Sequence, residues 1–136
     1  MNRYFSKTTK FSLAVCLGLF LAVGCSSTKG LENYSIDSDG AIQAYKPNMN
    51  KDVVRLKGEL LTKGKQVGDR WEYLFKVNEI LNYGDTFSTV QPKVGEEVIL
   101  YSPEEIKFKK NSTVVLDAFT PINRVEGKLK INMVID

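Results

Sequence analysis

The chain has 136 residues with 19 basic and 16 acidic side chains, and it contains no histidine. This length suits one small domain. The missing histidine removes the side chain that most often serves as general base or metal ligand at neutral pH, so histidine-based catalysis and histidine metal sites are excluded.

Residues 1–24 are typical of a secretory signal peptide. Residues 1–10 are polar and positively charged, and the thirteen residues 11–23 follow without a charged side chain. A membrane-spanning helix needs about 20 apolar residues, so this run is short for a permanent anchor. Removing the segment takes away Cys16 and leaves a mature chain with 16 basic and 16 acidic residues, which is net neutral.

The residues around Cys25 resemble a known processing signal. Leu-Ala-Val-Gly-Cys at residues 21–25 resembles the lipobox of bacterial lipoproteins, with Ala22 at the position where leucine is usual. The resemblance implies cleavage before Cys25, a diacylglycerol on its thiol and an acyl chain on its new amino group. In hosts with two membranes, Ser26 would favour the outer membrane. The alternative is ordinary signal cleavage at the same bond, which would leave a free thiol at an exposed terminus.

Residues 25–52 are expected to form a flexible tether, because serine, asparagine, glycine and proline are frequent there. Residues 41–45 have only a weak strand pattern. Residues 37–40, Asp-Ser-Asp-Gly, resemble a fragment of a calcium loop, but Ser35 and Lys46 stand where the first and last ligands belong. A solvated turn is the better interpretation, and no metal site is predicted.

From residue 53 to the end, five segments carry apolar side chains at every second position. They lie at residues 54–60, 71–77, 98–100, 114–118 and 129–135, and turn-forming residues separate them. An alternation with a period of two predicts strands that each bury one face. Residues 53–136 are therefore predicted to form one antiparallel β domain.

One short helix is expected between the third and fourth strands. Ser102-Pro103-Glu104-Glu105 has a serine at the N-cap position, a proline at the first helical position and a glutamate at the third. This combination is a capping box, and its acids suit the positive end of a helix dipole. Residues 109–112, Lys-Lys-Asn-Ser, are expected to end the helix.

Five strands with a helix between the third and fourth resemble the OB-fold, a five-stranded Greek-key barrel. Gly58 adds to the resemblance, because a glycine partway along the first strand allows that strand to bend and serve both sides of a barrel. The fold class expected is therefore all-β, with a five-stranded antiparallel OB-like barrel over residues 53–136. A small β-sandwich is the alternative, although it usually has about seven strands.

The OB resemblance implies a ligand groove formed by two loops and by the face of the second and third strands. Basic and aromatic residues at these places are the candidate groove residues: Lys63, Lys65, Arg70, Tyr73, Tyr101, Arg124 and Lys128. The competing interpretation is that the aromatic residues belong to the core and the lysines only keep the surface soluble.

No catalytic residue, metal site or cofactor is predicted. Two pairs of adjacent carboxylates occur, Glu96-Glu97 and Glu104-Glu105. Neighbours in a strand point to opposite faces, and neighbours in a helix diverge by about 100°, so neither pair can act on one bond. Phosphate-binding loops, zinc spacings and a Ser-x-x-Lys stretch in the mature domain are also missing.

These observations favour a lipid-anchored, non-catalytic binding or scaffold module on the periplasmic face of the outer membrane, with an envelope protein or a glycan as its partner. The alternative is an envelope hydrolase that uses carboxylates alone, as glycosidases can. Nucleic-acid binding is not expected, because a net-neutral mature chain lacks the basic field that phosphate backbones require.

Overall fold

The computed structural model describes residues 35–135, which form a single β-sheet. Its strands are β1 (Ser35–Ile36), β2 (Ile42–Ala44), β3 (Val54–Leu60), β4 (Lys65–Val67), β5 (Arg70–Tyr83), β6 (Glu97–Ser102), β7 (Thr113–Phe119) and β8 (Lys130–Met133). The predicted signal peptide, Cys25 and Ser26 lie outside the described residues. No helix occurs in residues 35–135, so none there is long and apolar enough to cross a membrane.

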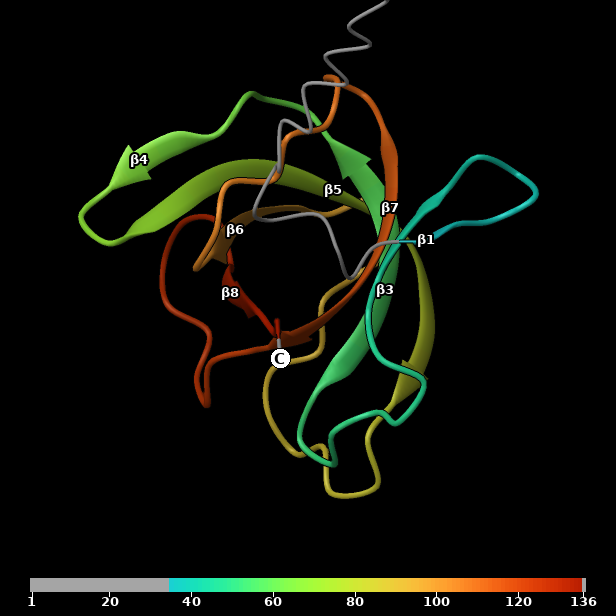
Figure 1. The fold of residues 1–136 in the computed structure, drawn as a ribbon. Coiled ribbons are helices and arrows are strands. Elements are labelled where there is room, and N and C mark those ends of the chain that lie inside the picture. The colour runs from blue at the N-terminus through green and yellow to red at the C-terminus, as the bar shows by residue number, and fades with distance from the viewer. Residues whose placement is uncertain (1–34, 136) are drawn as a thin grey trace, which may run out of the picture.

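Five of the strands close into a barrel, as the sequence predicts. β3 pairs with β5, β5 with β6, β6 with β8, β8 with β7, and β7 returns to β3 (Figure 1). This is an all-β, OB-like arrangement with extra strands. The expectation of purely antiparallel pairing is wrong for one pair, because β6 and β8 run parallel. A closed ring with an odd number of strands cannot alternate direction throughout, so one parallel pair is required.

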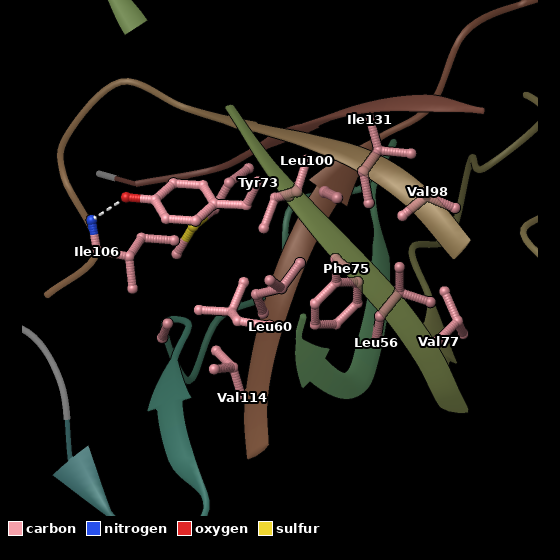
Figure 2. Close-up of a cluster of buried hydrophobic side chains, with 14 of the residues drawn as sticks. Leu56, Leu60, Tyr73, Phe75, Val77, Val98, Leu100, Ile106, Val114 and Ile131 are labelled. Atoms are coloured by element: carbon pink, nitrogen blue, oxygen red, sulfur yellow. Dashed lines mark hydrogen bonds between the residues drawn. The ribbon is translucent and has the colours of Figure 1, made fainter. Parts of the chain in front are cut away.

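The barrel interior is filled by the apolar face of each strand. Burial alternates strictly along β3, and Phe75 and Val77 of β5, Leu100 of β6 and Ile131 of β8 are fully buried. Figure 2 shows these side chains converging from different strands on one cluster. Each fully buried aliphatic or aromatic side chain contributes about 1.5–3 kcal/mol relative to exposure, so this cluster is the main source of stability.

Gly58 lies where β3 bends, as predicted. The register between β3 and β5 shifts between Lys57 and Gly58. A Cβ atom at position 58 would overlap with the backbone oxygen of Lys76 and with the ring of Phe75. The bend therefore needs a residue without a side chain, because the neighbouring strand and the Phe75 ring occupy the space.

The predicted helix after Ser102 is wrong. Residues 103–112 contain only bends, turns and irregular chain. The Ser102 hydroxyl donates to the carbonyl of Glu104 at 2.6 Å and accepts from its amide at 3.3 Å, so it closes a local turn that no helix follows. The chain then continues without a helical turn, because buried Ile106 packs on the core cluster and donates its amide to the Tyr73 hydroxyl at 2.6 Å.

The domain begins earlier than residue 53, so the predicted tether is too long. β2 pairs with β7 in parallel, with Ile42 opposite Val114 and Ala44 opposite Leu116. Ala41 and Ala44 are buried. The physical reason is that β8 pairs with β7 only at Ala118 and Phe119, so β2 pairs with the remaining edge of β7 and adds Ala44 to the core cluster.

The turn at residues 37–40 is a local structure held by one carboxylate, which agrees with the turn interpretation. Asp37 Oδ1 accepts hydrogen bonds from the amides of Asp39 at 3.0 Å and Ala41 at 2.9 Å. The bond from Ala41 is the main cause that lowers the pKa of Asp37 below its ordinary value. The carboxylate is therefore used to close the turn between β1 and β2.

Candidate functional site

The outward side chains of β5, β6 and β8 form a continuous surface, which we call the β5–β6–β8 face. Register places Glu72 beside Tyr101, and Tyr101 beside Asn132 of β8. The next row joins Leu74 to Ile99. Side chains that are partners in register point to the same side of a sheet. The face thus carries an aliphatic pair in a surface that is otherwise polar and charged.

An open hollow of about 400 Å³ lies over this aliphatic pair. We call it the lysine hollow; its lining residues are Thr62, Lys63, Lys65, Glu72, Tyr73, Leu74, Ile99 and Lys128. Leu74 and Ile99 are half-buried and form its floor. The chain from residue 61 to 63 is held against this floor, because the amide of Leu74 donates to Thr62 Oγ1 at 2.9 Å and the amide of Leu61 donates to the carbonyl of Leu74 at 2.8 Å.

A second hollow of about 330 Å³ lies farther along the same strands. We call it the tyrosine hollow; its lining residues are Asp69, Arg70, Tyr101, Ser102, Pro103, Asn132 and Met133. The Arg70 guanidinium carbon lies 3.8 Å from the centroid of the Tyr101 ring, which is a cation–π contact. Desolvation, followed by the charge of Glu72 and a hydrogen bond with it, raises the pKa of Tyr101. The phenol therefore stays neutral at physiological pH.

Tyr73 does not belong to an open groove. Its side chain is 2% exposed, and its hydroxyl accepts the amide of Ile106 inside the core (Figure 2). Burial raises the pKa of this hydroxyl. The absent side chain of Gly64 lets the chain lie directly on the tyrosine ring and close this end of the barrel. Although Tyr73 borders the lysine hollow, its ring supports the floor from inside and offers no stacking surface.

Arg124 also lies outside the lining of the two hollows. Its Nη1 contacts Glu96 Oε1 at 2.5 Å, and its Nη2 donates to the carbonyl of Gln91 at 3.3 Å. These contacts link the β7–β8 loop, which carries Arg124, to the β5–β6 loop, which carries Gln91 and Glu96. The hydrogen bond from Arg124 is the main cause that lowers the pKa of Glu96. Arg124 thus holds two loops together.

The adjacent carboxylates Glu96 and Glu97 are paired with different cations. Glu96 binds Arg124, whereas Glu97 Oε2 lies 2.7 Å from Lys128 Nζ. The bond from Lys128 lowers the pKa of Glu97. Glu104 and Glu105 are exposed in the irregular chain after β6. Each hollow is lined by a single carboxylate, Asp69 in the tyrosine hollow and Glu72 in the lysine hollow.

Sequence reasoning missed the Arg55–Asp117 pair on the neighbouring side of the barrel. These residues are register partners on β3 and β7, with Arg55 Nε 2.7 Å from Asp117 Oδ1 and Nη2 2.9 Å from Oδ2. Arg55 also donates to the carbonyl of Lys46 at 2.9 Å and lies over the Tyr45 ring at 3.8 Å. The pair therefore fastens the segment after β2 to the barrel. The signal was an aspartate within the apolar strand 113–119, but its partner became visible only with the strand pairing.

Of the seven candidate groove residues, the structure brings Lys63, Lys65 and Lys128 together at one hollow and places Arg70 and Tyr101 at the other. Within residues 35–135, no group of three or more acidic or cysteine side chains could hold a metal ion. Comparison of the chain with protein-family models, with curated proteins and with solved structures found no match.

Proposed function

We propose that this protein is a membrane-anchored envelope lipoprotein that acts as a non-catalytic binding or scaffold module for an envelope protein or a glycan. The β5–β6–β8 face is its contact surface. The single observation that carries the proposal is the lysine hollow, in which two half-buried aliphatic side chains lie on the outside of the barrel between lysine side chains.

The composition of this hollow supports binding. Leu74 and Ile99 project outward from central barrel strands, where a strand with one buried face ordinarily carries polar side chains. Apolar surface framed by polar groups is typical of interaction sites. Filling the hollow would remove the remaining exposed surface of both side chains from water, at about 25 cal/mol for each Å² buried.

We favour a binding module over the alternative carboxylate-dependent hydrolase because of how the adjacent carboxylates are held. Glu96 and Glu97 each bind a different cation, which stabilises both as charged groups and directs them apart. A glycosidase instead needs two carboxyl groups across one bond, with one of them kept protonated.

The membrane anchor is proposed at Cys25, with Ser26 directing the protein to the periplasmic face of the outer membrane. We expect Cys25→Ser to lose all acyl mass and to leave the membrane fraction, because two or more acyl chains at one residue are needed for firm attachment. Intact mass spectrometry of detergent-extracted protein, together with fractionation, measures both effects. Ser27→Ala is the matched control and should stay acylated, and Ser26→Asp should shift the protein to the inner membrane. An unmodified thiol on the mature terminus of the wild type would contradict the anchor.

The contact surface is tested by photocrosslinking in intact cells. A photoreactive amino acid at Lys65, on the rim of the lysine hollow, should give a discrete adduct with an envelope protein or with glycan. The control position is Asp39 in the turn between β1 and β2; β4 and this turn project from opposite sides of the barrel (Figure 1). The same adducts from both positions, or none from Lys65, would contradict the proposal.

A further inference from the structure

We propose that the lysine hollow binds an extended acidic peptide segment that inserts an aliphatic side chain onto Leu74 and Ile99. This inference rests on the proposed function and narrows it, because it selects a protein partner over a glycan. Three properties of the hollow support it: the chemistry of its floor, the charge of its rim and the arrangement of both along the strands.

The floor suits an aliphatic side chain better than a sugar ring. It consists of the branched side chains of Leu74 and Ile99, which are direct partners across β5 and β6. Sugar rings are usually held on flat aromatic faces. The aromatic ring on this face, Tyr101, already has the Arg70 guanidinium stacked 3.8 Å from its centroid. The other ring at the hollow, Tyr73, is buried beneath the floor.

The rim carries more positive than negative charge, because Lys63, Lys65, Lys128 and Lys130 stand against the two acids Glu72 and Glu97. Lys63 and Lys65 are exposed, and within residues 35–135 neither forms a salt bridge. Of the two acids nearby, Glu97 is bound by Lys128, and Glu72 is the register partner of both Lys65 and Tyr101 and shares a hydrogen bond with Tyr101. Lys130 adds a further cation, as the register partner of Ile99 on β8. This excess charge complements a ligand with carboxylates.

The arrangement fits an extended peptide. Lys63 and Lys65 lie on one side of the aliphatic floor, where the chain leads into β4, and Lys128 lies on the other side, just before β8. In an extended peptide, alternate side chains point the same way about 7 Å apart. One aliphatic side chain can therefore occupy the floor while carboxylates two residues away on each side of it reach Lys63 or Lys65 in one direction and Lys130, beside Ile99, in the other. Because the lysines are exposed, the attraction should weaken as salt rises.

Methyl NMR of the full mature chain in detergent micelles tests the inference. The probes are a capped peptide with one leucine and a glutamate two residues away on each side of it, a matched peptide with lysine in place of glutamate, and oligogalacturonate as an acidic glycan. We expect the acidic peptide alone to shift the methyl signals of Leu74 and Ile99, with binding that weakens as salt is added. The methyl signals of Leu56, which is fully buried in the core, should not move and report that the fold is intact.

Two charge-reversal variants test whether peptide affinity depends on the lysines of the rim or on the charge of the protein as a whole. Lys65→Glu should weaken binding of the acidic peptide about fivefold, because it replaces an attraction with a repulsion of similar size. The matched control Lys51→Glu is also at an exposed position but is not among the residues that line the hollow, and it should leave the affinity unchanged.

The outcomes distinguish this inference from the function on which it rests. Shifts caused by oligogalacturonate but not by the acidic peptide would overturn the peptide inference and keep a binding face for glycan. Equal binding of the acidic and basic peptides would overturn the role of the lysines. If no probe moves Leu74 or Ile99 while Lys65 still crosslinks in cells, the inference fails and the proposed function stands.

Discussion

Gly58→Ala is expected to lower the free energy of unfolding by about 3 kcal/mol, at the upper end of the cost of overpacking a core. The added Cβ would overlap with the backbone oxygen of Lys76 and with the ring of Phe75. A backbone atom in a paired strand cannot rotate away as a flexible side chain can. The clash must therefore separate β3 from β5 or displace Phe75 from the centre of the core, and both changes remove buried apolar contacts.

Urea unfolding followed by tryptophan fluorescence measures this effect, since the single tryptophan, Trp71, packs against the core. Lys57→Ala, at the preceding residue of the same strand, is the control and should change stability by no more than about 0.5 kcal/mol. A Gly58→Ala variant as stable as the control would mean that the β3 bend tolerates a side chain, contrary to the structure.

Asp117→Ala is the second large expected effect, with a loss of about 3 kcal/mol. The side chains of Arg55 and Asp117 are only 14% and 6% exposed, so the substitution leaves a cation largely removed from water without its partner. The contacts of Arg55 with the Tyr45 ring and the Lys46 carbonyl would hold it there. We expect the segment from β2 to β3 to loosen together with the loss of global stability.

A double-mutant cycle tests whether the unpaired charge of Arg55 causes the loss of stability. Replacing both residues with apolar ones, Arg55→Met with Asp117→Leu, should recover most of the loss, because it removes the unpaired charge as well as the pair. Hydrogen exchange of the β2 amides measures the loosening of this segment. If Asp117→Ala lowers the free energy of unfolding by less than about 1 kcal/mol, the Arg55 side chain can turn into solvent at little cost. The pair would then not fasten the segment from β2 to β3 to the barrel.

The five barrel strands were predictable because their signal is local and repeated. In residues 54–60 and 71–77, apolar side chains recur at every second position, except at Gly58, and the structure turns that set toward the core. Gly58 was also predictable, since a glycine inside a strand indicates a bend or a close approach. The parallel pairing of β6 and β8 follows from closure of the ring, which no single segment reveals.

The helix after Ser102 shows where a local signal loses to tertiary packing. An N-cap contributes typically about 1 kcal/mol, whereas burial of an isoleucine side chain contributes about 1.5–3 kcal/mol. Ile106 reaches the core cluster and also supplies the hydrogen bond that the buried Tyr73 hydroxyl needs. The irregular path that allows both contacts is therefore preferred over a capped helical turn.

Tertiary contacts also decide which of the candidate groove residues meet at the lysine hollow and which do not. Lys63, Lys65 and Lys128 meet because OB-like topology brings the chain after β3 and the chain before β8 to the same strands. Strand parity and an ion pair decide where Tyr73 and Arg124 point. Tyr73 falls on the inward face of β5, and Arg124 is drawn to Glu96.

By itself, the sequence determined the all-β class, the positions of the barrel strands and the bend at Gly58, because periodicity and glycine placement act within a few residues. The tertiary structure alone decided the parallel closing pair, the pairing of β2 with β7, the Arg55–Asp117 pair and the aliphatic floor between lysines. Each of these features joins residues that are far apart in the chain. Their formation depends on which strands become neighbours, and burial of the whole core selects that arrangement.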